Sequence, residues 1–191
     1  AIAQPVIIST VSNIFADPNF PKSTEKLTGT RQEPLSLLLF AQNDAQLIAD
    51  FRQAGWYRAD NISLTSLIKT AKAVLFNTED LTAPLVPYFW DAQVHDFGFQ
   101  KPTDAQTVRQ RHHARFWKTS YQTVDGKHVY VGTASLDIGI KWGVTHKISP
   151  DIDTEREFLF TDFQNAGLVE NFQKEQFVEP TVGQNFLGDM F

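Results

Sequence analysis

The pattern of apolar positions changes character near the middle of the chain. In the first half, residues 35–40 form a nearly continuous apolar run, which is typical of a strand buried on both faces. Two segments with helical spacing follow, one beginning at Asn43 and ending at Gly55, the other beginning at Ser63. The second helix repeats apolar residues on one face, which ordinarily packs on a core: Leu64, Leu67, Ile68, Ala71 and Leu75.

The second half of the chain alternates strand-like segments with turn residues. The two-residue period of a strand covers residues 88–100, 109–119, 127–142 and 145–148. Asp125-Gly126, between two of these segments, predicts a tight hairpin. A third helix is expected from 149 to about 166, where Gly167 stops it. Its buried side is expected to consist of Ile152, Leu159, Phe163 and Ala166.

These elements predict a single α+β domain. A mixed or largely antiparallel sheet would be covered by about three helices. Residues 1–33 mix proline, glycine and polar residues without a sustained period, so they are expected to form an irregular lead-in with a strand or loop around 6–11. The domain proper would then be 34–191, because the sequence shows neither an internal repeat nor a linker that divides it.

Composition narrows the function classes. The chain has 191 residues, with 17 basic and 22 acidic side chains, a net charge of −5 and 42% hydrophobic residues. This acidic balance argues against nucleic acid as a partner, because binding it normally requires a basic footprint. The absence of cysteine excludes a thiol nucleophile, a cysteine zinc site and an iron–sulfur cluster. The longest apolar run is far shorter than the ~20 residues of a membrane helix, so the chain is expected to be soluble as it stands.

Sequence motifs for several kinds of chemistry are missing. The chain has no nucleophilic-serine elbow, no glycine loop for phosphates, no dinucleotide fingerprint and no metalloprotease helix. We therefore expect no cofactor. An enzyme built on this chain would use acid–base or metal-assisted hydrolysis.

The strongest candidate for chemistry is the strand-like segment 111–117. A period of two residues places Arg111, His113 and Arg115 on one face of a strand. Two guanidiniums beside an imidazole need partners, which are either carboxylates of the protein or an anion from outside. Arginine suits both, because its planar fork meets the two oxygens of a carboxylate or phosphate.

Asp137 is the first candidate partner for these cations. A hairpin through Asp125-Gly126 would lay its strand beside the 111–117 segment, within reach of either arginine. One interpretation is an internal ion pair. The other is a polar face, shared with Ser135, that binds a ligand.

A second constellation surrounds the start of the third helix. Ser149, Asp151 or Asp153 could be its N-cap, and Asp153 and Arg156 stand three residues apart on one helix face. His146 with these two aspartates would also make an oxygen and nitrogen metal set if His113 came near. The spacing matches no metal motif, so no metal site is predicted.

A third candidate segment covers residues 91–101. If it forms one strand, Asp91, Gln93 and His95 lie on the same face. Asp96 then falls on the other face, among apolar residues. Because an acid on an apolar face needs a partner, Asp96 is a candidate counterion for an arginine of the 111–117 segment.

Five segments carry a family resemblance. They are residues 55–60, 95–101, 111–117, 131–137 and 146–156, in this order between about residue 33 and residue 168. Together they resemble the LssY C-terminal domain family, and 111–117 and 146–156 are the most specific of them. Residues 183–189 are similar to the family's closing motif, after which the resemblance implies a further strand.

The resemblance implies a bacterial domain whose activity is not established. Relatives carry this domain behind membrane-embedded modules, including DedA-like and phosphatidic-acid-phosphatase-like ones. It therefore implies an envelope or membrane-surface setting within a larger protein, and phosphorylated or lipid-linked partners. This is analogy at the level of the family, and it transfers no catalytic residue.

Three functions remain open. The first is an accessory or binding domain whose Arg/His face recognises an anionic or phosphorylated small molecule or lipid headgroup. The second is a phosphoester hydrolase, metal-assisted or acid–base, with its groups drawn from His113, His146, Asp137, Asp151 and Asp153. The third is a structural interaction domain with an internal ion network. The candidate site residues are Arg111, His113, Arg115, Asp137, His146, Asp151, Asp153 and Arg156.

Overall fold

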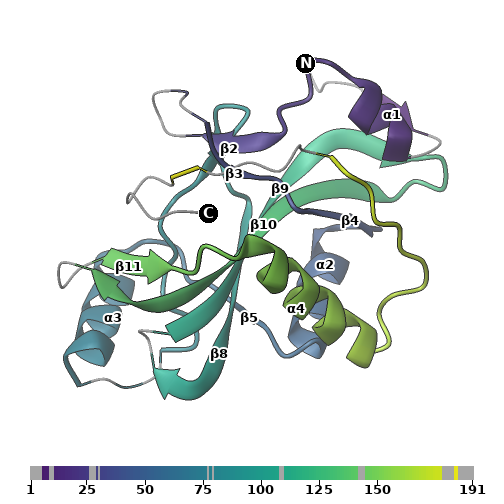
Figure 1. Cartoon of the computed structure of the whole chain (residues 1–191). Coiled ribbons are helices and arrows are strands. Elements are labelled where there is room, and N and C mark those ends of the chain that lie inside the picture. The colour runs from purple at the N-terminus through teal and green to yellow at the C-terminus, as the bar shows by residue number, and fades with distance from the viewer. Residues whose placement is uncertain are drawn as a thin grey trace.

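The computed structural model describes residues 6–8, 11–25, 29, 31–76, 78, 80–107, 110–141, 145–177 and 183–184 (Figure 1). Its centre is a long antiparallel hairpin of β9 (Gln110–Thr123) and β10 (His128–Lys141). The turn between them contains the predicted Asp125-Gly126 pair, and Gly126 has a φ of 83° that favours glycine.

Each outer edge of this hairpin is shared by two strands. β9 pairs with β8 (Phe97–Thr107) along one stretch and, in parallel, with β1 (Val6–Ile8) at its end. β10 pairs with β4 (Leu37–Ala41) and then with β11 (Thr145–Ile148). The short strand β5 (Tyr57–Arg58) extends the sheet beyond β8. Among the described residues this makes a seven-stranded sheet in which only the β1–β9 pairing is parallel.

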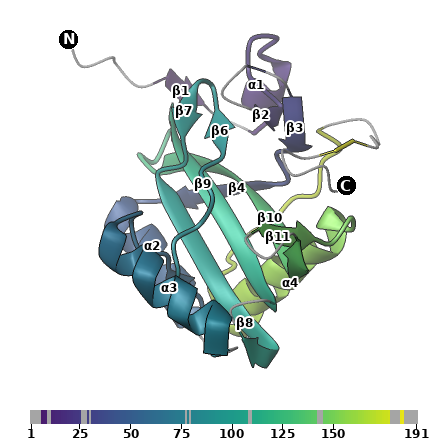
Figure 2. The same cartoon turned by 90° about the vertical axis from the view of Figure 1, so that its left-hand side faces the viewer.

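Two helices cover one face of the sheet. α2 (Asp44–Gln53) and α4 (Ile152–Asn165) pack on that face (Figure 2). The core between helices and sheet is rich in aromatic rings, and the Phe51 ring stacks on Phe99 with a centroid distance of 3.7 Å. This core contains Leu47, Phe51, Trp56, Phe97, Phe99, Ala114, Phe116, Tyr130, Leu159 and Phe163.

A small second sheet lies on the other side. Its order is β3 (Arg31–Pro34), β2 (Ser23–Glu25), β6 (Phe89–Trp90) and β7 (Gln93–Val94). Together with α1 (Val11–Ala16) it encloses a second core made of Ile8, Ile14, Phe20, Leu35, Trp90, Trp117, Val129 and Val131.

Helix α3 (Leu64–Phe76) forms an outer layer on this second side. Its buried residues are small, Ser66 and Ala73, and Ala73 packs against the fully buried Ala83. Thr70 donates a hydrogen bond to the Asp80 carboxylate at 2.8 Å. The helix therefore turns its polar side inward, onto the segment that carries Asp80.

The α+β class and the mainly antiparallel sheet are confirmed, and the structure contains four helices among the residues it describes. The predicted starts of α2 and α3 and the predicted end of α2 are also confirmed. Asn43 accepts a hydrogen bond from the Gln46 amide at 2.9 Å as the N-cap of α2, and Gly55 follows its end with a φ of 84°. The Ser63 hydroxyl accepts from the Ser66 amide at 3.1 Å at the start of α3.

Two predictions about buried faces are wrong. On α3 the apolar residues Leu64, Leu67, Ile68, Ala71 and Leu75 are all exposed. The reason is that the buried Asp80 attracts the polar side of this helix. In β4 the run is only half buried, because Phe40 remains 37% exposed.

The predicted strand over 88–100 is broken in the structure. β6 and β7 form a hairpin around Asp91 and Ala92, whose φ values of 49° and 58° define a turn that a continuous strand does not contain. The predicted sharing of a strand face by Asp91, Gln93 and His95 is therefore wrong. Within the predicted irregular lead-in, the structure forms β1, α1, β2 and β3.

Candidate functional site

The Arg/His stripe, which we define as Arg111, His113 and Arg115, lies on one face of β9 as its two-residue period predicts. Each of the three side chains is only 4% exposed. The intervening residues face the helices on the other side, where Ala114 and Phe116 are fully buried. The stripe is thus enclosed between the main sheet and the segments that cover its second side.

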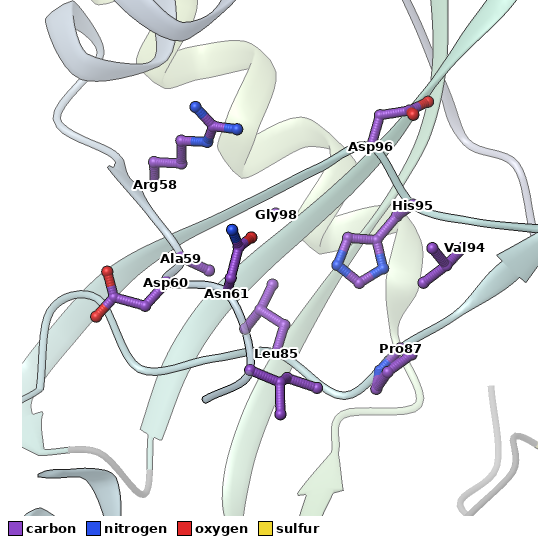
Figure 3. A pocket seen from close by; sticks show the side chains of 11 residues that line it. Arg58, Ala59, Asp60, Asn61, Leu85, Pro87, Val94, His95, Asp96 and Gly98 are labelled. Carbon is purple, nitrogen blue, oxygen red and sulfur yellow. The ribbon is translucent and has the colours of Figure 1, made fainter. Parts of the chain in front are cut away.

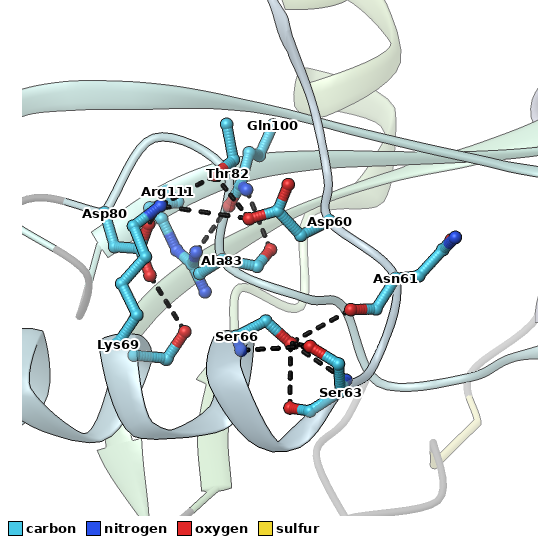
Figure 4. Close-up of polar contacts among 11 residues, drawn as sticks. Asp60, Asn61, Ser63, Ser66, Lys69, Asp80, Thr82, Ala83, Gln100 and Arg111 are labelled. Carbon is cyan, nitrogen blue, oxygen red and sulfur yellow. Dashed lines mark hydrogen bonds and ion pairs between the residues drawn. The ribbon is translucent and has the colours of Figure 1, made fainter.

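Arg111 is held by the neighbouring strand and by the loop above it. Its guanidinium donates to the side-chain oxygen of Gln100 on β8, and the Gln100 amide donates to the Ala83 carbonyl at 2.8 Å (Figure 4). Burial lowers the pKa of Arg111, and the charges of Asp137 and Asp80 oppose that shift. The Arg111 Nε–H has no hydrogen-bond partner among the described residues.

Arg115 lies on an aromatic ring. Its Nε donates to the Val86 carbonyl at 3.2 Å, and its guanidinium carbon lies 4.2 Å from the centre of the Tyr88 ring. The Tyr88 hydroxyl donates to the Glu33 carboxylate at 2.8 Å. Burial and the charge of Glu33 raise the pKa of Tyr88, while Arg115 acts in the opposite direction.

The carboxylate of Asp137 lies beside the His113 ring. Its Oδ2 lies 3.3 Å from the His113 Nε2, and Asp137 is 1% exposed. β10 thus brings Asp137 to the stripe, as the hairpin predicts. Asp96, expected as a counterion, is exposed and accepts from the Lys118 amide at 2.8 Å, so that expectation is wrong.

Several polar residues around the stripe were missed by the sequence analysis: the buried Glu33, Asp80 and Gln100, and the half-buried Tyr88. Another lies on the opposite face of β9. The Glu155 carboxylate of α4 lies 2.7 Å from His112, whose ring stacks on Phe158 at 3.9 Å. Glu155 could have been found, because it falls on the predicted buried side of the third helix between Ile152 and Leu159.

Asp151, Asp153 and Arg156, candidates from the segment after His146, stabilise the first turns of helix α4. Asp151 is its N-cap and accepts from the Thr154 amide at 2.9 Å, and Asp153 pairs with Arg156 at 2.7 Å. All three candidates are therefore bonded within the first turns of the helix. The side chain of His146 lies outside the described residues. Within the described part of the chain, no group of three or more acidic or histidine side chains is placed to hold a metal ion.

A pocket of about 240 Å³ lies beside the stripe, above Gly98. We call it the Gly98 pocket; its lining is Arg58, Ala59, Asp60, Asn61, Ile62, Leu85, Pro87, Val94, His95, Asp96 and Gly98. Gly98 pairs with Arg115 across the β8–β9 ladder. A Cβ atom on Gly98 would lie 3.4 Å from the His95 Nε2 and 3.1 Å from Leu85, so even a methyl group here would crowd these two side chains of the pocket.

The polar groups of the Gly98 pocket differ in orientation. Asn61 and His95 lie on either side of Gly98, whereas the carboxylates of Asp60 and Asp96 point away from them (Figure 3). Both carboxylates are bonded elsewhere: Asp60 accepts from Thr82 at 2.7 Å, and Asp96 accepts from the Lys118 backbone. The polar side chains that flank Gly98 are therefore those of Asn61 and His95, and the two carboxylates point away from them (Figure 3).

Comparison with known proteins identifies the family. A family model described as "LssY C-terminus" matches residues 18–191, nearly the whole chain. The chain belongs to the LssY C-terminal family. No curated protein and no solved structure matches it. Two of the segments that carry the resemblance, 55–60 and 95–101, contribute Arg58 and His95 to the Gly98 pocket of this LssY C-terminal domain.

His95 in this LssY C-terminal domain is held neutral. Burial, with the charge of Arg115, lowers its pKa from 6.5 to about 4. The Tyr88 amide donates to its Nδ1 at 3.4 Å, which assigns the proton of the neutral ring to Nε2. Since Nε2 lies next to Gly98, His95 presents an N–H donor to the pocket at neutral pH.

This shift predicts a loss of stability in acid. Between about pH 4 and pH 6.5 the unfolded state binds a proton on His95 and the folded state does not. The free energy of unfolding therefore falls as the pH falls through this window, by on the order of 3 kcal/mol. Urea unfolding of the wild type and of His95→Gln at the two ends of the window should show a smaller loss in the variant. Equal losses would contradict the assignment.

Proposed function

We propose that this LssY C-terminal domain is an accessory domain that binds an anionic ligand, of the phosphate or carboxylate class, in the Gly98 pocket. The observation that carries the proposal is the set of donors around Gly98. Asn61 supplies an amide and His95 its Nε2–H on either side of Gly98 (Figure 3), and Arg58 of β5, whose guanidinium lies 5.7 Å from the centre of the Phe97 ring, adds a positive charge at the rim. Two donors that face each other across the pocket, with a positive charge at its rim, can orient an anion.

The charge behind the pocket supports the same ligand class. Arg115 is close enough to lower the pKa of His95, so its positive potential reaches the pocket. The guanidinium itself is buried against Tyr88 and the Val86 carbonyl, and a ligand would feel its charge without touching it.

The buried stripe then has a structural role in the same proposal. Glu33, Asp80 and Asp137 are even less accessible than Arg111 and Arg115, with exposures of 1%, 3% and 1%. Buried charges of both signs in one place support an internal ion network that fixes the sheet. The network would hold β8 and the segment around Val86 in position, and these two elements form the pocket walls.

The test is the melting temperature with and without inorganic phosphate at constant ionic strength. A ligand at about 100 times its dissociation constant stabilises the folded state by about 2.7 kcal/mol, which is a shift of about 5 °C or more for a chain of this size. The shift should be strongly reduced in Arg58→Ala and in Gly98→Ala, whose new methyl group fills the pocket floor.

The matched control is Arg52→Ala, which removes an exposed arginine from the last turn of α2, away from the pocket lining. It should keep the full shift. A phosphate shift that all three variants retain would place the anion elsewhere. No shift with phosphate or with a di- or tricarboxylate would refute the proposed function.

A further inference from the structure

Helix α3 presents an apolar face to solvent. The large apolar side chains exposed on it and just before it are Ile62, Leu64, Leu67, Ile68, Leu75 and Phe76. Leu64 and Leu75, at its two ends, are 76% and 75% exposed. A group of large apolar side chains on one helix is more than the single exposed residues of an ordinary surface, and it marks an interaction site.

The orientation of α3 is fixed by its polar side. The Ser66 hydroxyl donates to the Asn61 carbonyl at 2.9 Å, and Thr70 bonds to the buried Asp80 (Figure 4). Lys69 also pairs with Asp80 at 2.6 Å. Rotating the helix to bury Leu64 and Leu75 would break these contacts and leave the Asp80 carboxylate unpaired, so the apolar face is held outward.

The charges of this surface are of one sign. The 13 residues of α3 include two lysines, Lys69 and Lys72, and no acidic residue, although the chain as a whole has a net charge of −5. Lys72 is exposed, whereas Lys69 is paired with Asp80 at 2.6 Å and lies 3.8 Å from the Asp60 carboxylate. An apolar helix face with an exposed lysine beside it complements a surface that is both apolar and anionic.

The apolar face continues into the Gly98 pocket. Ile62 lines the pocket and is itself 56% exposed, and Leu64 begins the helix two residues later. A molecule that has an anionic head and an apolar body would therefore find complementary groups side by side.

We propose that α3 and the Gly98 pocket together dock this domain on a lipid surface that carries anionic headgroups, with the headgroup in the pocket and α3 lying in the interface. The inference rests on the proposed anion binding and adds the chemistry of what carries the anion. The helix would lie on the bilayer: among the residues that the structure describes, none of the helices is long and apolar enough to cross one.

The experiment is co-sedimentation of the full 191-residue chain with vesicles of phosphatidylcholine, alone or mixed with phosphatidic acid. We expect binding to the mixed vesicles only. Leu75→Glu and Leu64→Glu should each weaken vesicle binding at least about tenfold. Each replaces a leucine that would be buried in the bilayer by a negative charge that the anionic headgroups repel. Val124→Glu, in the β9–β10 turn, is the matched control: Val124 is also 75% exposed and should be replaceable without effect.

A second measurement separates the two proposals. Leu75→Glu should keep the phosphate-induced rise in melting temperature, because Leu75 is not part of the pocket lining. Phosphate binding by the wild type without any vesicle binding would overturn the lipid inference and leave the anion site standing. Equal binding to neutral vesicles would also overturn it. A wild-type dimer that Leu75→Glu converts to a monomer, without vesicle binding, would assign the face to a second copy of the chain instead.

Discussion

Arg115→Ala should lower the free energy of unfolding by about 3–5 kcal/mol, the usual effect of removing one partner from a buried set of charges. The substitution removes the guanidinium that lies on the Tyr88 ring and leaves the carboxylates of Glu33 and Asp137 in the protein interior with less positive charge around them. For a chain of this length the melting temperature should fall by about 10 °C or more, which thermal unfolding followed by circular dichroism would measure.

Two further variants make this result specific. Arg52→Ala removes an exposed arginine and should change the melting temperature by only about 1–2 °C. Arg115→Lys keeps the charge but loses the planar guanidinium over Tyr88, so its melting temperature should lie between those of Arg115→Ala and Arg52→Ala. A small effect of Arg115→Ala would mean that the buried stripe does not hold the sheet, and the network interpretation would be wrong.

Gly132→Ala should destabilise the protein by about 3 kcal/mol, because β10 passes directly against the ring of Phe116 at this position. A Cβ atom on Gly132 would overlap that ring and lie 2.7 Å from the Arg115 carbonyl oxygen. Neither neighbour can give way easily. Phe116 is fully buried and packs edge-on against Phe51 at 5.3 Å, and the carbonyl belongs to the backbone of β9.

Gly139 on the same strand is the control for this effect. A Cβ atom there would meet nothing within 4 Å. Gly139→Ala should therefore be neutral or slightly stabilising, since alanine loses less backbone entropy on folding than glycine. Chemical denaturation of the two variants side by side should separate them clearly. Equal stabilities would show that the hairpin adapts to the added methyl group.

Features that depend on a few neighbouring residues were predictable from the sequence. The caps of α2 and α3, the turn at Asp125-Gly126 and the alternation along β9 each depend on contacts within a few positions of the chain. The arrival of Asp137 next to the stripe follows from the same hairpin register. For these features the local chemistry leaves little choice of conformation.

Features that depend on distant segments were not predictable. The inward side of α3 is decided by Asp80, a residue outside the helix, and hydrophobic spacing alone selected the wrong face. Glu33 joins the network from β3, whose short sequence has no strand signal. The Gly98 pocket depends on the hairpin at Asp91-Ala92, which has no glycine to indicate a turn with positive φ.

The central hairpin also determines how the molecule comes apart. Neighbouring residues of β9 belong to different cores, since Phe116 packs under the helices while Trp117 packs under the small sheet. Neither core can lose its structure without disturbing the same strand. Opening of one side is therefore coupled to opening of the other, and the amides of β9 belong to the last region to exchange with solvent, in a single cooperative unit that spans both layers.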